Sequence, residues 1–234
     1  MTQNHIFVLQ QVINDLLDTD SSLEKAMVRL NYFARLIKNE ELIAYTDFEI
    51  NGYKNSQVPP YRLGMATLHI KMQAWETYHT AQLPVEMLEK PLNEGLKYIN
   101  IFEGIKVLEV MAAKSQESQL ITKKLPMTML KYFQPAATKL YKSNVQLVVI
   151  EAWLTANSNI VIQILSTVRS RLLAFAMQIA EEFGYDIDIS SFKKNQNANN
   201  KVINNFIKNE IINHGSGNIT NTGNSAEVTG DIDL

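Results

Sequence analysis

A run of apolar residues at helical spacing, from residue 160 to residue 183, constrains the fold of this chain most. The spacing predicts one long helix whose apolar stripe must be covered by other elements. That stripe consists of Val161, Ile164, Val168, Leu172, Phe175, Ile179 and Phe183. Gly184 is suited to end the helix. Arg169 and Arg171 lie near its centre, where charge is costly in lipid, so we expect a core helix and no membrane span.

The first 53 residues predict three further helices. An apolar stripe that begins at Ile6 predicts the first helix, and Ser21 with Glu24 forms a capping-box pattern for the second. Asn39 is suited to cap the third helix, and Gly52 is suited to end it. We therefore expect an N-terminal three-helix segment.

Strands are predicted where apolar residues recur at every second position instead of every third or fourth. Residues 65–74 alternate strictly between apolar and polar, and residues 78–83 are the expected partner strand. A β-branched run over 145–154 predicts a buried strand, and 185–189 predicts a short edge strand. The fold class is therefore α+β and mostly helical, with a short antiparallel sheet, a long C-terminal helix and then a β-forming assembly tail.

The composition changes at residue 190. Residues 1–189 form the predicted α+β domain, and the polar, asparagine-rich residues 190–200 predict a linker. Residues 201–213 predict a short amphipathic helix. A helix this short is marginal alone in water, so it must pack on its own body or on another copy.

Residues 214–234 form a tail with the sequence HGSGNITNTGNSAEVTGDIDL. From Ala226 to Leu234, apolar side chains occupy even positions and polar ones odd positions, which predicts a strand with no partner nearby in the sequence. Unpaired main-chain groups favour pairing with other copies, whereas the alternative is a disordered, solubilising tail. We expect a homo-oligomer, as a trimer or an open stack. The candidate assembly residues are Phe206, Ile207, Ile211, Ile219, Val228, Ile232 and Leu234.

A second candidate site lies where the third helix meets the following extended chain. A glycine at the helix end and the prolines of Val58-Pro59-Pro60 force a sharp turn, which brings Arg62 within reach of Glu49. We favour a structural ion pair here, and the alternative is a recognition site lined by arginine and tyrosine. The residues of this corner are Glu49, Gly52, Tyr53, Pro60, Tyr61 and Arg62.

A third candidate is the stretch 118–150, which has no acidic residue between Ser118 and Ile150. Its lysines are Lys123, Lys124, Lys131, Lys139 and Lys142, and aromatic residues lie between them. Basic charge with stackable rings suits single-stranded nucleic acid. We favour instead a solvated lysine face over core aromatics.

The sequence predicts no catalytic residue, cofactor or metal site. The chain has no cysteine, its four histidines show no metal-ligand spacing, and it lacks the common phosphate-binding and nucleophile motifs. An enzyme is therefore not favoured. A formal net charge of −2 gives no global attraction to nucleic acid. The first residues do not resemble a signal peptide, so we expect a cytoplasmic location.

Two segments resemble the AbiTii family of bacterial abortive-infection proteins. ELIAYTDFEINGYKNSQVPPYR (41–62) resembles that family's helix, turn and P-Y-R element, and ILSTVRSRLLAFAMQIAEEFG (164–184) resembles its later helix. Arg62, Arg169 and Arg171 lie at family-like positions. The tail resembles the Gly/Asn-rich amyloid-signalling motifs of immune proteins. The resemblance implies defence against phage, in which the infected cell stops growing or dies, and it supplies no established active site.

We therefore expect an antiphage effector or adaptor that acts through homo-oligomeric assembly. Its partner is a second copy of itself, with a phage component or a neighbouring defence protein as further candidates. The alternative is a toxin enzyme that acts on nucleic acid or nucleotides through the basic 118–150 surface.

Overall fold

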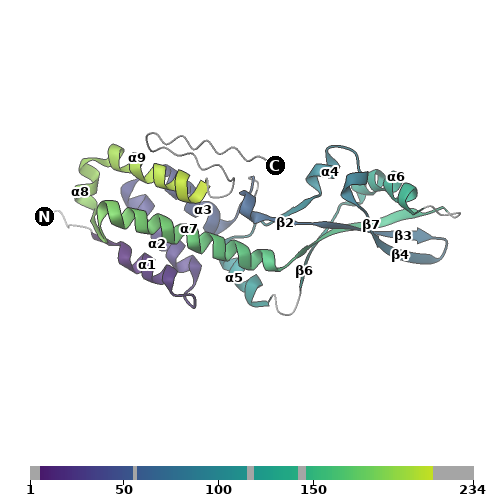
Figure 1. Cartoon of the computed structure of the whole chain (residues 1–234), viewed down its shortest axis with the longest axis horizontal. Helices are drawn as coiled ribbons and strands as arrows, with labels where there is room; N and C mark the ends of the chain where they lie inside the picture. Colours follow the sequence, from purple (N-terminus) through teal and green to yellow (C-terminus); the bar gives the residue numbers. More distant parts are fainter. Residues whose placement is uncertain (1–5, 55–56, 115–118, 142–145, 213–234) are drawn as a thin grey trace, which may run out of the picture.

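The computed structural model describes residues 6–54, 57–114, 119–141 and 146–212. The molecule is elongated, with a helical body at one end and a sheet-based arm at the other (Figure 1). The body contains α1 (Leu9–Leu17), α2 (Leu23–Ile37), α3 (Glu40–Asn51), α5 (Ile105–Lys114), α7 (Asn159–Phe183), α8 (Ile189–Lys194), α9 (Gln196–Phe206) and the π-helix η4 (Ile207–Ile212). This composition confirms the predicted mostly helical α+β class.

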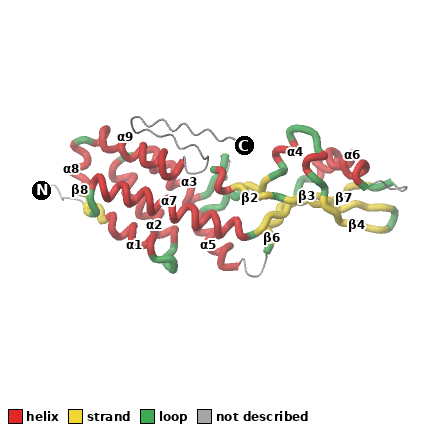
Figure 2. Tube along the Cα trace, in the orientation of Figure 1, coloured by secondary structure: helices red, strands yellow, loops and turns green. Residues whose placement is uncertain are grey.

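The arm is built on an antiparallel sheet with the strand order β4-β3-β7-β6. Its strands are β3 (Thr67–Ala74), β4 (Thr77–Gln82), β6 (Leu120–Lys124) and β7 (Val148–Asn157). Its helical pieces are η2 (Val85–Met87), α4 (Leu92–Gly95), η3 (Met127–Met129) and α6 (Leu130–Leu140). Figure 2 shows most of the strands at this end and most of the helices at the other. The predicted hairpin of residues 65–74 and 78–83 is confirmed.

Three short elements complete the chain. The 3-10 turn η1 (Pro60–Arg62) and the strands β2 (Leu63–Met65) and β5 (Tyr98–Asn100), which pair antiparallel, join the body to the arm. At the far end of the body, β1 (Ile6–Val8) pairs with β8 (Asp186–Asp188). The edge strand predicted at 185–189 is therefore confirmed. The helix predicted from Ile6 begins instead at Leu9, because residues 6–8 pair with β8.

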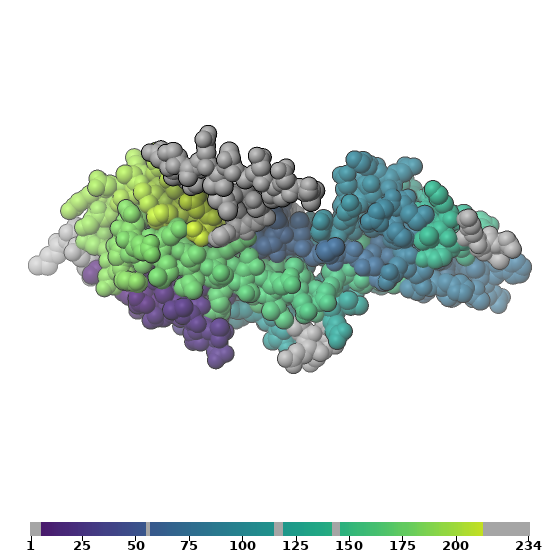
Figure 3. Space-filling model, in the orientation of Figure 1, coloured from purple at the N-terminus to yellow at the C-terminus, as the bar shows by residue number. Residues whose placement is uncertain are grey.

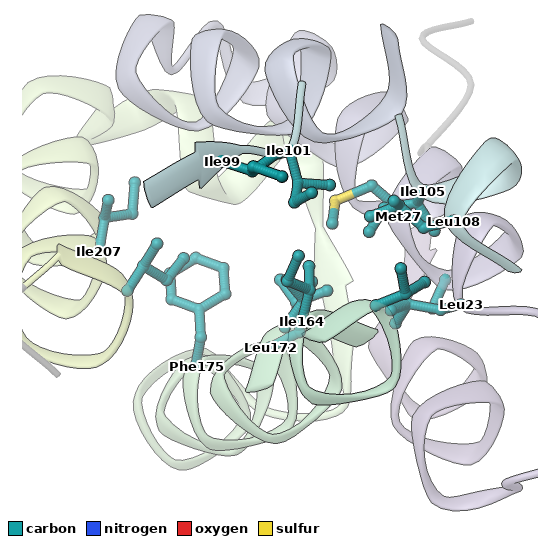
Figure 4. Packing of buried hydrophobic residues seen from close by; sticks show 14 of the residues in the cluster. Leu23, Met27, Ile99, Ile101, Ile105, Leu108, Ile164, Leu172, Phe175 and Ile207 are labelled. Carbon is teal, nitrogen blue, oxygen red and sulfur yellow. The ribbon is translucent and has the colours of Figure 1, made fainter. Parts of the chain in front are cut away.

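The helix α7 organises the core of the body, as its spacing predicts. Leu172 and Phe175 face Met27 of α2, Ile105 of α5 and Ile207 of η4 across the buried centre (Figure 4). The space-filling view shows the body and the arm as two masses along one long axis (Figure 3). By length and composition α7 is also the one helix among the described residues that could cross a membrane.

The start of α2 corrects one prediction. The helix begins at Leu23, and no side chain of its own first turn caps it. The carboxylate of Glu109, on α5, instead accepts the Leu23 N–H at 2.6 Å and the Ser22 hydroxyl at 2.8 Å. A tertiary contact therefore replaces the predicted capping box of Ser21 and Glu24.

The segment 190–200 is helical, which corrects the predicted linker. Ile189 and Phe192 of α8 are buried in the core. The amides of Gln196 and Asn200 donate to Ile37 O, at 3.1 and 3.3 Å, where α2 ends and its last carbonyls lack helical partners. The polar composition thus reflects helix capping. The domain boundaries at 189, 200 and 213 stay predictions, and the tail 214–234 lies outside the described residues.

Candidate functional site

The corner between α3 and η1 is shaped by two glycines. Gly52 ends α3 with a φ of +84°, and its neighbour Tyr53 donates its N–H to Phe102 O at 2.8 Å. A Cβ on Gly52 would collide with that carbonyl, and a Cβ on Gly104 would collide with Ile50 O. Both glycines are thus required by a close approach of two backbones. No local pattern in the sequence marks Gly104.

The predicted ion pair of Glu49 and Arg62 is confirmed. Arg62 Nη2 lies 2.5 Å from Glu49 Oε2, and both side chains are 0% exposed. The other guanidinium nitrogen, Nη1, donates to Glu103 O at 2.7 Å and to Ile101 O at 3.3 Å. A buried charge pair is tolerated only when its remaining hydrogen-bonding groups are satisfied, as they are here.

Three phenols surround this pair. Tyr53 and Tyr61 donate their hydroxyls to Glu49 Oε1 at 2.7 and 2.6 Å. The Arg62 guanidinium also lies 4.8 Å from the centroid of the Tyr53 ring. The Tyr45 hydroxyl is buried beside Tyr61 and has no hydrogen-bond partner of good geometry among the described residues. Sequence reasoning missed Tyr45.

The electrostatics of the corner keep its phenols neutral. Burial, and then the negative charge of Glu49, raise the pKa values of Tyr53 and Tyr61 above the ordinary value. Burial likewise raises the pKa of Tyr45. Burial alone lowers the pKa of Arg62, but the Glu49 carboxylate and the neighbouring phenols outweigh it, so the net direction is upward. The corner is therefore a buried pair of fixed charges that phenols solvate in place of water.

The two arginines of α7 connect other elements to this helix. Arg169 donates to Asp18 O at 2.8 Å and to Ser21 O at 2.7 Å, and also to the carbonyls of Asp15 and Leu16 at 3.1 Å. It therefore satisfies the open C-terminal end of α1. Arg171 stacks 4.7 Å from the Tyr61 ring centroid and donates to Ile211 O at 2.9 Å.

A cavity of about 500 Å³ lies between the corner and the C-terminal helix. Tyr45, Pro59, Pro60, Tyr61, Arg171, Ile211 and Ile212 line it. Two phenols of the corner, Tyr45 and Tyr61, line this cavity, and Tyr61 donates its hydroxyl to Glu49. The corner thus has one inner side that is fully buried and one outer side that borders the cavity.

The predicted assembly residues fall into three groups. Ile207 and Ile211 are buried in the core of their own chain, where η4 packs on α7. Phe206 is half-buried at the end of α9; Ile212, which was not among the predicted residues, is 63% exposed at the end of η4. Ile219, Val228, Ile232 and Leu234 lie outside the described residues. The short helix therefore packs on its own body, which was one of the two alternatives.

The predicted lysine surface is divided between two elements. Lys123 and Lys124 are exposed on β6, whereas Lys131 and Lys139 are exposed on α6. Lys142 lies outside the described residues. The aromatic residues of α6 also differ in burial, since Phe133 is fully buried while Tyr132 is exposed. Among the described residues, no group of three or more His, Asp or Glu side chains is placed to hold a metal ion.

The fold and the corner define a mostly helical α+β protein in which Arg62, Arg169 and Arg171 connect its helices. A family model, AbiTii, matches residues 8–205. The chain belongs to the AbiTii family of abortive-infection proteins, which associates it with phage defence. The match covers the corner, the arm and α7. Neither a curated protein nor a solved structure matches the chain.

Proposed function

We propose that this AbiTii-family protein is an antiphage effector or adaptor that acts through homo-oligomeric assembly by its C-terminal helix and tail. The observation that carries the proposal is the anchoring of η4. Ile207 and Ile211 fix this helix to α7, while Ile212 is left 63% exposed at the last turn. Ile212 is one of several exposed apolar side chains of the body, and it is the one that lies where the chain leaves the body toward the tail.

The anchoring gives assembly a physical advantage. In every copy the last turn of η4 is held at the same point of the body, since Arg171 also donates to Ile211 O. The alternating pattern from Ala226 to Leu234 then favours pairing of identical strands. Several copies joined in this way multiply any weak contact that each copy makes with a target.

Light scattering on the purified chain tests the proposal. Deletion of residues 215–234 is expected to lower the oligomer mass, and Ile212→Asp is expected to lower it as well. Leu17→Asp is the matched control, because Leu17 is 62% exposed on α1. An unchanged mass in the deletion variant contradicts the proposal, and so does an equal loss in the control.

Induced expression without phage separates an effector from an adaptor. An effector is expected to stop cell growth by itself, whereas an adaptor leaves growth unchanged until a phage component or a neighbouring defence protein is supplied. The same cells test the alternative of a toxin enzyme. Degradation of cellular nucleic acid on induction favours that enzyme over assembly alone.

A further inference from the structure

The sheet of the arm has two unlike faces. Leu68, Ile70 and Met72 of β3 are buried on the face where α6 packs against the sheet. Figure 1 shows α4 and α6 on one side of these strands. Because side chains alternate along a strand, His69 and Lys71 point to the other face, which we call the open face. Residues that lie directly opposite one another on paired strands share a face, so the pairing of β3, β4, β6 and β7 also places on the open face Tyr78, Trp153, Glu151 and Lys124.

Aromatic rings occupy three adjacent strands of the open face. His69 of β3 lies directly opposite Trp153 of β7, and their rings stack with centroids 5.6 Å apart and an interplanar angle of 7°. Tyr78, on the neighbouring strand β4, is 57% exposed. Tyr78 therefore offers an exposed π-face to a flat group, whereas the half-buried rings of His69 and Trp153 cover each other and offer one outer face each.

Cations lie beside these rings. Lys71 Nζ is 5.1 Å from the centroid of the Tyr78 ring, and Lys124 lies opposite Trp153 in the register of β6 and β7. Glu151 is the acidic residue among them, and its carboxylate is 4.0 Å from Lys71 Nζ. Residues 63–100 and 119–157 together hold eight lysines and five glutamates, a formal charge of +3 in a chain of −2. The arm therefore attracts anions, although the whole chain does not.

The remaining side chains of the open face disfavour an apolar protein partner. The positions around the rings are mainly threonines and glutamines, as at Thr80, Gln73 and Thr122, and the exposed apolar side chains of Val148 and Leu120 lie apart, at the two ends of the sheet. Such side chains donate and accept hydrogen bonds but bury little apolar area. Rings, lysines and polar side chains in one plane are the combination that binds unstacked bases and their phosphates.

We propose that the open face of the arm binds single-stranded nucleic acid. Bases stack on Tyr78 and on the outer faces of the His69–Trp153 pair, and phosphates meet Lys71 and Lys124. This places the contact on the sheet, whereas the sequence pattern pointed to Lys131 and Tyr132 of α6. The proposal is independent of assembly, because none of these residues belongs to the C-terminal helix or tail.

The two tryptophans allow a direct test, since Trp75 lies in the turn between β3 and β4 and Trp153 lies on the open face. In a Trp75→Phe variant, Trp153 is the only tryptophan. Oligothymidylate or oligouridylate of about 15 nucleotides is expected to quench its fluorescence. In the reciprocal Trp153→Phe variant, Trp75 fluorescence is expected to stay unchanged. Quenching by the DNA or the RNA oligomer supports the proposal, and quenching by neither overturns it.

A matched pair of variants locates the contact. On the sheet, Lys71 lies over the ring of Tyr78. On α6, Lys131 Nζ lies in the same way 4.8 Å from the centroid of the Tyr132 ring. The side chains of Tyr78 and Tyr132 are similarly exposed, at 57% and 53%. Tyr78→Ala is expected to weaken binding of the labelled oligomer roughly 5- to 150-fold, the range for one lost base stack. Tyr132→Ala is expected to leave it unchanged. The reverse result overturns the open-face site.

Salt dependence tests the phosphate contacts. The logarithm of the association constant is expected to fall with the logarithm of salt concentration, and Lys124→Glu is expected to reduce the slope by about 0.7 or more. Lys131→Glu is the control. Binding that is insensitive to salt, or duplex DNA that competes as well as the single strand, overturns the proposal. Deletion of residues 215–234 should leave the Trp153 quenching intact, which separates this test from that of assembly.

Discussion

The body and the arm use the same pairing of a cation with a phenol ring in opposite ways. In the body, Arg62 lies 4.8 Å from the Tyr53 ring, and the guanidinium and its Glu49 partner are fully buried. In the arm, Lys71 lies 5.1 Å from the Tyr78 ring, which is largely exposed. The first pair has its hydrogen-bonding capacity used within the chain, whereas the second offers a ring and a charge to solvent.

This difference separates residues that hold the fold from residues that can meet a partner. Arg62, Arg169 and Arg171 of the body reach main-chain carbonyls or a buried carboxylate, so they connect α1, α3, η1 and η4 to the core. The cations of the arm are lysines, whose flexible, strongly hydrated ammonium groups remain in water. Joined copies would bring several arms together, which would strengthen a weak contact of each arm.

The largest effect is expected from breaking the corner. Glu49→Ala leaves the Arg62 charge buried without its partner, so we expect a loss of about 3–5 kcal/mol in the free energy of unfolding. Urea denaturation followed by circular dichroism measures it. Glu151→Ala is the control from the arm, because its partner Lys71 is 4.0 Å away and both side chains are partly exposed. We expect less than about 1 kcal/mol there. Equal losses of unfolding free energy in the two variants would contradict the proposed difference between the body and the arm.

Alkaline pH should destabilise the body before it affects the arm. The pKa values of Tyr45, Tyr53 and Tyr61 are raised in the folded chain, mainly by burial. Their contribution to stability is therefore complete below the ordinary tyrosine pKa of about 10 and is lost as the pH rises above it, where only the unfolded chain ionises. A pH titration followed by phenolate absorbance and circular dichroism should show these phenols ionising together with loss of helix. Ionisation of all nine tyrosines with the helices intact contradicts this prediction.

The next effect concerns the family-like arginine on α7. Arg169→Ala removes hydrogen bonds to three carbonyls at the end of α1 and to Ser21 O in the turn that follows it. We expect a loss of about 2–3 kcal/mol, since bonds to a charged group are worth more than neutral ones. Differential scanning calorimetry measures it, with Lys139→Ala on α6 as the control. A melting temperature that matches the control variant would show that Arg169 is not a structural residue.

A smaller effect is expected at the cap of α3. The Asn39 side chain accepts the Leu42 N–H at 2.9 Å and donates to Asn204 Oδ1 at 2.7 Å, which joins α3 to α9. Asn39→Ala should cost about 1 kcal/mol through the lost cap. Hydrogen exchange should show faster opening of the first turn of α3. Asn39→Asp keeps the cap but loses the donor to Asn204. If its exchange rates match those of the wild type, the hydrogen bond to α9 does not stabilise the first turn of α3.

Local patterns in the sequence predicted most of the elements and part of the corner. The 3-4 spacing of residues 161–183 and the alternation of 65–74 predicted α7 and β3, because both patterns depend on neighbours along the chain. The pair of Glu49 and Arg62 was predicted because Gly52 and the prolines fix a turn between them. In each case the contact is encoded within about one turn or one loop.

What the sequence did not predict depends on contacts between distant segments. The cap of α2 comes from Glu109, and the carbonyls at the end of α2 are met by amides of α9, so neither a local capping box nor a linker was needed. The open face requires the register of four strands, which pairs His69 with Trp153 across more than 80 positions. No window of the sequence contains that information.

The central claim is that the open face of the arm meets the target while the corner of the body holds the fold. Plating of phages that the wild-type chain restricts, on cells that express paired variants, tests it most directly. We predict that Tyr78→Ala with Lys124→Glu abolishes restriction while the free energy of unfolding changes by less than about 0.5 kcal/mol, and that Tyr132→Ala with Lys131→Glu keeps restriction. Full restriction by the open-face variant would contradict the claim.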